Sequence, residues 1–314
     1  MSFSAVRQQF ISFFNQPIHP APLGIFRVLI AAFTLVQAFL WRADWQAFLG
    51  KDAWIQWEIS KAVVPEISLH ISQVATWFTY LGINENQAVM TFFWLYTVCA
   101  FGLLLGFFTR FWALFTWLCH YVVMCSIDIY VYGVDIFLQI SLFYCMVMPV
   151  QKAFSLDALF RNIDTSPTWG VTLSIRVLQI HLCLAYLSAG YEKMLSVDWW
   201  NGNVLWRSLV QPDFRQFDFT WLAGYPWLAM ILSWFTMFIE TFYGIGMWIP
   251  RVRIYWLLSI IALHIGICLF LGLWLFGLIM ILLSISAFGF DVYKDLLTVK
   301  KIAVIKIKAK GDPD

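Results

Sequence analysis

The chain has 314 residues, of which 61% are hydrophobic, 19% are aromatic and only 12% are charged. Soluble domains are about 45–50% apolar and about 25% charged, so this composition excludes an ordinary soluble protein and predicts an all-α, polytopic membrane protein. The net charge of +2 is too small to indicate a nucleic-acid partner, and membrane lipid is the expected surrounding.

The N-terminal residues 1–22 are predicted to form an amphipathic segment in the membrane interface, interrupted by three prolines. No hydrophobic stretch there ends in small residues, so we expect no cleaved signal peptide. The first membrane span is predicted at 23–41, with Arg27 one turn inside it.

Between the first two spans, residues 42–85 are mixed in polarity. Ile67, Ile71, Val74 and Leu81 recur there at helical spacing, which predicts an amphipathic helix that lies in the interface. The later spans are predicted at 87–108, 111–127, 135–150, 170–190, 227–249, 254–271 and 273–289. The expected fold is a bundle of about eight transmembrane helices plus this interfacial helix.

The basic residues predict the orientation of that bundle. Twelve lysines and arginines fall on the side that carries both termini, and six fall on the other side, whose loops are longer. By the positive-inside rule, both termini of this multi-pass protein are expected in the cytoplasm, with the spans in a cell inner membrane. The domains are then an interfacial segment 1–22, a transmembrane domain 23–290 and a basic tail 291–314, for which binding to the leaflet and disorder both stay open.

All six cysteines lie within apolar runs, without a C-x-x-C pair or a His/Cys cluster at metal-ligand spacing. This pattern predicts neither a disulfide framework nor a metal site. His120 and His181 are interpreted as packing residues. Asp128, Tyr130 and Asp135 are interpreted as a solvated turn with a helix cap.

Residues 176–207 contain the polar groups most suggestive of function. Arg176, Gln179, Cys183, Tyr186, Gly190 and Lys193 recur at steps of three and four residues, so they share one helix face. About 17 residues at 1.5 Å each place Lys193 and Arg176 near opposite membrane faces. Lys193 can therefore be an anchor that reaches the headgroups, or a functional amine.

The pattern Tyr186-x-x-x-Gly190-x-x-Lys193, followed by Asp-Trp199-Trp-x-Gly202, resembles the HTTM superfamily, whose best known members are vitamin K-dependent γ-glutamyl carboxylases. The stretches LGIFRVLIA near the start, LGFFTRFWAL at 105–114, FSLDALF at 154–160 and the sequence around His264 fit the same family. By its length, this chain is expected to resemble the short bacterial members, which lack the large lumenal domain of the carboxylases.

The resemblance implies an enzyme that uses a reduced naphthoquinone or another quinol, with O₂ and, in a true carboxylase, CO₂. In that family a lysine is the base that deprotonates the quinol, and this role falls on Lys193. A low-dielectric pocket suits the role because an amine acts as a base only when neutral. Tyr186, Gly190, Trp199 and Gly202 are the corresponding cofactor-binding candidates.

Two further ionisable residues lie within predicted spans. Placing an ionisable side chain in the membrane costs free energy, so both residues are candidates for a functional site. Glu240 is either a catalytic group or a structural partner of Arg27 or Arg176. His264 is a candidate to bind a quinone oxygen or Glu240, or to tie two helices together. Trp199 and its neighbour suit either an interfacial aromatic belt or a stacked quinone.

One family residue is missing, because the carboxylases carry a histidine shortly before the segment that matches FSLD, where this chain has Gln151-Lys152-Ala153. Three functions therefore stay open. The first is an HTTM-type enzyme that modifies a peptide or lipid, with Lys193, His264 and Glu240 at its centre. The alternative is a non-enzymatic membrane subunit, or a partner in peptide maturation or export, that retains the fold; transport is a third, less favoured possibility.

Overall fold

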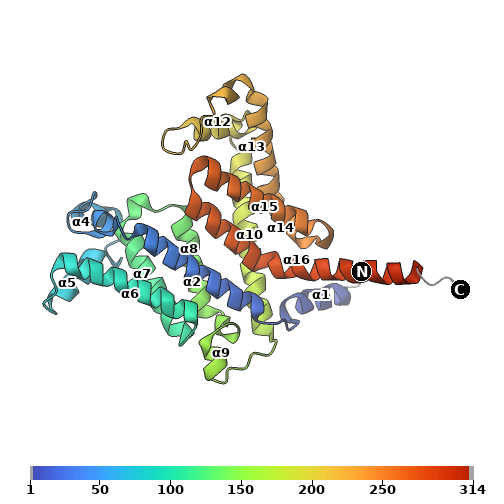
Figure 1. Cartoon of the computed structure of the whole chain (residues 1–314), viewed down its shortest axis with the longest axis horizontal. Coiled ribbons are helices and arrows are strands. Elements are labelled where there is room, and N and C mark those ends of the chain that lie inside the picture. The colour runs from blue at the N-terminus through green and yellow to red at the C-terminus, as the bar shows by residue number, and fades with distance from the viewer. Residues whose placement is uncertain (1–2, 311–314) are drawn as a thin grey trace. The chain divides into compact units, whose positions relative to one another are not determined.

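The computed structural model describes residues 3–310, which form sixteen α-helices and no β-strand (Figure 1). Away from its ends, a helix satisfies its backbone hydrogen bonds within one segment, which a bilayer core without water requires. The predicted all-α membrane fold is confirmed.

All eight predicted spans fall on helices, and five of these helices are long and apolar enough to cross a membrane. The five are α2 (Ala21–Trp41), α6 (Glu85–Leu105), α10 (Trp169–Met194), α15 (Pro250–Leu271) and the first part of α16 (Trp274–Lys310). The other predicted spans coincide with α7 (Thr109–Ser126), α8 (Gly133–Val147), and α13 (Pro226–Thr241) with α14 (Tyr243–Trp248). Of these, α8 and α13 are shorter than the roughly 17–25 residues of a typical span.

The segments between the spans are more helical than the sequence indicated. The single interfacial helix expected within 42–85 is replaced by α3 (Trp45–Leu49), α4 (Trp57–Val63) and α5 (Ile71–Thr79). Pro65 explains one break, because the residue before a proline avoids the helical conformation and Val64 is extended. The remaining helices are α1 (Phe3–Asn15), α9 (Leu156–Phe160), α11 (Val197–Trp200) and α12 (Asn203–Val210).

At the C-terminal end, α16 continues through the predicted basic tail as far as Lys310. Residues 290–310 contain neither glycine nor proline, so the chain offers no signal that would end the helix earlier. The last four residues of that tail lie outside the described residues.

The chain divides into two compact units, Met1–Ser174 and Ile175–Asp314, which we describe separately. In the first unit, α2, α6, α7 and α8 pack on one another, and α3, α4 and α5 cover them at one end. Its core is aromatic: the buried Trp45 ring lies against Phe92, Phe93 and Tyr96. Near this core, His120 Nδ1 lies 3.0 Å from the Tyr96 hydroxyl.

Arg27 is completely buried in the first unit. Its guanidinium donates hydrogen bonds to the carbonyls of Leu103 and Leu104, at 2.5 and 2.6 Å, and to the carbonyl of Phe154. The first two carbonyls belong to the last turn of α6, which has no further helical N–H groups to bind them. Gly106 then ends α6 with a φ of +67°, and a side chain there would overlap the guanidinium. Arg27 therefore caps α6.

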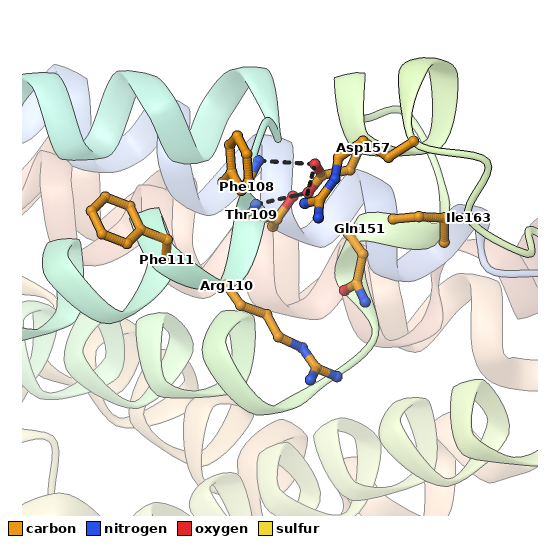
Figure 2. Close-up of a pocket in the computed structure, with 8 residues that line it drawn as sticks. Phe108, Thr109, Arg110, Phe111, Gln151, Asp157 and Ile163 are labelled. Atoms are coloured by element: carbon orange, nitrogen blue, oxygen red, sulfur yellow. Dashed lines mark hydrogen bonds and ion pairs between the residues drawn. The ribbon is translucent and has the colours of Figure 1, made fainter.

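A pocket of about 360 Å³ lies at the turn between α6 and α7 (Figure 2). Asp157 borders it and accepts hydrogen bonds from the backbone N–H groups of Phe108 and Thr109, at 2.9 and 2.8 Å, and from Arg161. Burial raises the pKa of Asp157, but the hydrogen bonds to its carboxylate lower it more, so the pKa lies below the usual 3.8. The aspartate of the FSLDALF stretch thus caps the N-terminus of α7.

His70 caps the N-terminus of α5 and is 1% exposed. Its Nδ1 accepts a hydrogen bond from the Ser72 backbone N–H, so Nε2 carries the proton and donates to Ser60 Oγ at 2.8 Å. Burial, with a smaller contribution from the charge of Lys61, lowers the pKa of His70 from 6.5 to about 4. The folded protein therefore holds His70 neutral at pH 7.

We expect His70 to make stability depend on pH. The unfolded chain takes up this proton near pH 6.5, and the folded protein takes it up only near pH 4. The stabilisation is therefore complete above pH 6.5 and is lost as the pH falls to about 4, by roughly 3 kcal/mol. His70→Asn retains a capping acceptor and should reduce the slope of unfolding free energy against pH in this range. The exposed His19→Asn is the control, and an unchanged slope in His70→Asn would contradict the assignment.

Candidate functional site

The polar face of α10 lies within the second unit from residue 175 onward, and its groups meet partners on other helices. At one end, Arg176 donates to Gln179 Oε1 at 2.7 Å, and Gln179 Nε2 donates to Asp291 and to the Ala287 carbonyl of α16. Nearby, Arg253 of α15 pairs with Asp295 of α16 at 2.6 Å. This end of the face ties α10 and α15 to α16 through charged hydrogen bonds.

The middle of the face is a buried cluster built around Tyr186. Its hydroxyl lies 2.8 Å from His264 Nε2 on α15 and 3.5 Å from Ser284 Oγ on α16. The Tyr243 ring of α14 stacks on the Tyr186 ring at 4.2 Å, and its hydroxyl donates to Ser284. Four helices therefore contribute one side chain each to this cluster.

Lys193 lies two turns beyond Tyr186 on α10 and forms the other end of the face. Its Nζ lies 2.6 Å from Glu240 Oε2 on α13, and the two side chains are only 21% and 8% exposed. The Trp199 ring, on α11, lies 5.3 Å from the same Nζ, within the range of a cation–π interaction. The amine is thus held between a carboxylate and an aromatic face.

The two glycines of the motif allow close backbone contacts. A side chain at Gly190 would overlap the backbone nitrogen and the hydroxyl of Thr241. Gly202 has a φ of +78°, which favours glycine, and a side chain there would overlap the backbone of Ala229 and Met230. Both glycines therefore let the Lys193 region approach α13, the helix that supplies Glu240.

The structure joins residues of the 176–207 stretch to two candidates from elsewhere in the sequence: Tyr186 contacts His264, and Lys193 contacts Glu240 as well as Trp199. The structural partners considered for Glu240 were wrong, because its partner is Lys193 whereas Arg27 and Arg176 bind other groups. His264 ties α15 to α10, as one of the expectations for it had it, but it does so through the Tyr186 hydroxyl and not through a carbonyl.

Sequence reasoning missed Tyr243 and Ser284. Tyr243 follows Glu240 by three residues, so in a continuous helix the two side chains would share one face. This spacing is the signal in the sequence that could have identified Tyr243 as part of the site. Ser284 is an isolated small polar residue in an apolar span, and spacing does not distinguish it from Ser286, which has no hydrogen-bond partner among the described residues. Only the packing of α16 against α10 and α14 reveals its place.

An all-α bundle that contains helices apolar and long enough to cross a membrane, together with a buried lysine–glutamate pair, indicates a membrane protein with a polar site inside its helical bundle. Comparison with known families makes the assignment specific: a model of the HTTM domain matches residues 15–291. The chain belongs to the HTTM domain family. No curated protein and no solved structure matches it.

Proposed function

We propose that this HTTM-family membrane protein is an enzyme that uses a quinol and O₂ to modify a peptide or lipid, with Lys193 as the base. The observation that carries the proposal is the buried Lys193–Glu240 pair at 2.6 Å, beside the Trp199 ring. Ionisable groups in an apolar bundle are costly, so a pair retained at the end of a polar helix face suggests a functional site.

The residues around Lys193 fit a quinol. Nδ1 of His264 is buried and lacks a hydrogen-bond partner among the described residues, so it is free to bind a ligand hydroxyl. Trp199 offers an aromatic face for stacking. A quinol, when bound, supplies reducing equivalents to O₂ and yields a base strong enough to take a carbon-bound proton, with CO₂ as the further reactant if the product is a carboxylate.

Lys193 acts as a base only after it has lost its own proton. Glu240 Oε2, at 2.6 Å, is positioned to receive that proton, and the transfer converts two buried charges into two neutral groups. An apolar environment favours the neutral pair, since desolvated charges are costly. Neutral Lys193 can then take the proton of a quinol hydroxyl at Nζ, while His264 and Trp199 orient the ring.

The proposed setting is a cell inner membrane, crossed several times, with both termini in the cytoplasm. The distribution of lysines and arginines supports this orientation. It would place Lys193 near the outer face, so a peptide or lipid substrate would approach from that side.

A second candidate is a non-enzymatic subunit or maturation partner, and one observation favours it. Gln179 and Tyr186 hydrogen-bond to side chains of α15 and α16, as interhelical packing residues do. A stable protein that co-purifies, together with indifference to Lys193 substitution, would support this function.

The test is native mass spectrometry of the gently purified protein, with organic extraction of quinones, on wild type and Lys193→Met. We expect a quinone in the wild type that is depleted in the variant. A stoichiometric partner protein in both forms, without quinone, would instead support the non-enzymatic subunit. Far-UV circular dichroism of both forms controls for misfolding.

A further inference from the structure

We propose that the first unit contains a separate binding site for a small organic ammonium group. The site is a pocket of about 200 Å³, smaller than the roughly 300–1,000 Å³ of drug-sized ligand pockets. We call it the Asp135 pocket. Three aliphatic side chains line part of it, and the other lining residues are five aromatic residues and one charged group: Trp41, Trp45, Phe48, Tyr130, Tyr132 and Asp135.

The aromatic lining suits a cation. Ring faces of tryptophan and tyrosine attract ammonium groups, and cages of such rings recognise methylated amines. The rings come from three parts of the chain: the end of α2, both ends of the short helix α3, and the turn before α8. The Trp41 and Trp45 rings lie 6.5 Å apart, and Phe48 meets Tyr130 edge-on at 5.5 Å. These rings therefore lie next to one another around the pocket.

Asp135 supplies the negative charge. Its side chain is buried, with an exposed fraction of 2% for the residue, although the sequence indicated a solvated turn. The carboxylate accepts from Gln37 Nε2 at 2.9 Å and from the Tyr132 N–H at 3.3 Å, and both donors are neutral. Among the described side chains, no lysine, arginine or histidine forms an ion pair with it.

A buried carboxylate without a cation is unusual, because charges inside proteins are normally paired. Gln37, which donates to Asp135, adds a second acceptor that is not satisfied. Its Oε1 is buried and lacks a hydrogen-bond partner among the described residues. The two N–H donors also leave acceptor capacity on the carboxylate. An ammonium group in the pocket would lie close to this carboxylate and to the aromatic residues that line the pocket.

Choline is the probe, and its neutral carbon isostere 3,3-dimethyl-1-butanol tests whether charge matters. Binding is measured by isothermal titration calorimetry on the full chain in nanodiscs of phosphatidylglycerol. We expect choline to bind at least about tenfold more tightly than the isostere. Asp135→Asn, which keeps the shape and the capping oxygen, should weaken choline binding by about tenfold or more. Asp128→Asn, an exposed carboxylate in the same turn, should leave it unchanged.

Tyr130→Leu gives a second variant in case Asp135→Asn fails to fold, because Tyr130 is 39% exposed. It should weaken choline binding while the unfolding temperature stays near that of wild type. Equal binding of choline and its isostere, no choline binding in the wild type, or full binding in both folded variants would each overturn the proposal.

The same ammonium chemistry occurs in soluble amines and in lipid headgroups, and the lipid of the nanodisc distinguishes them. Weaker apparent choline binding in phosphatidylcholine discs than in phosphatidylglycerol discs would assign the site to a lipid headgroup. Equal binding in the two would assign it to a soluble ammonium compound. Lys193→Met protein that is folded, as far-UV circular dichroism checks, should bind choline as the wild type does in either disc, so this site and the proposed quinol chemistry can fail independently.

Discussion

Replacing Lys193 by methionine is expected to abolish quinol oxidation and also to destabilise the fold. Loss of a general base typically costs about 10²–10⁴-fold in rate. The same substitution leaves Glu240, 8% exposed, as an unpaired buried carboxylate, which typically costs about 3–5 kcal/mol. Quinol consumption in proteoliposomes and the free energy of unfolding in detergent measure the two effects.

A double substitution separates the two effects. Lys193→Met combined with Glu240→Leu removes both charges and should recover most of the lost stability, because an apolar pair of similar volume often replaces a buried ion pair without loss. Activity should stay absent. Activity that persists in a folded Lys193→Met protein would exclude the lysine base.

The control for these variants is a lysine–glutamate pair on the surface. Lys51 Nζ lies 2.8 Å from Glu85, and its side chain is 60% exposed. Lys51→Met should change neither stability nor activity appreciably, since solvent screens such pairs. A comparable effect at both lysines would mean that burial of the Lys193 pair has no special consequence.

Arg27→Leu is expected to be the most destabilising single substitution in the first unit. It removes the donors of three backbone carbonyls, those of Leu103, Leu104 and Phe154. Unpaired buried acceptors cost about 1–3 kcal/mol each, so we expect a loss of roughly 3–5 kcal/mol in the free energy of unfolding. Unfolding followed by near-UV circular dichroism in detergent measures it.

Arg110→Leu is the matched control, because Arg110 is an exposed arginine near the same turn. It should change the unfolding free energy by less than about 0.5 kcal/mol. Arg27→Lys should lie between the two, since one ammonium cannot reproduce the planar fork that reaches several carbonyls. If Arg27→Leu were as stable as Arg110→Leu, the guanidinium would not be what holds the end of α6.

The sequence predicted the helices well because lipid imposes a simple rule. Apolar runs of about 20 residues become helices, and α2, α6, α10 and α15 begin and end within a few residues of the expected positions. The connecting segments were harder. Short helices such as α3 and α12 depend on packing more than on a periodic apolar pattern, which needs more residues to be detected.

The sequence identified most residues of the candidate site, but it did not predict which of these residues contact one another. Lys193, Glu240 and His264 stand out because ionisable side chains are rare in apolar spans. That Lys193 meets Glu240, and that His264 meets Tyr186, depends on how α10, α13 and α15 are rotated about their axes. Spacing along one helix carries no information about that rotation.

The length of α16 has a mechanical consequence. Its 37 residues make a rod of about 55 Å, against a hydrocarbon layer of about 30 Å, so an upright α16 projects well beyond the lipid. The same rod carries Ser284, which contacts Tyr186, and Asp291, which binds Gln179. A soluble protein that binds the projecting part could therefore tilt the whole of α16. Such a tilt would shift Ser284 and Asp291 relative to the polar face of α10, although the soluble protein makes no contact inside the membrane.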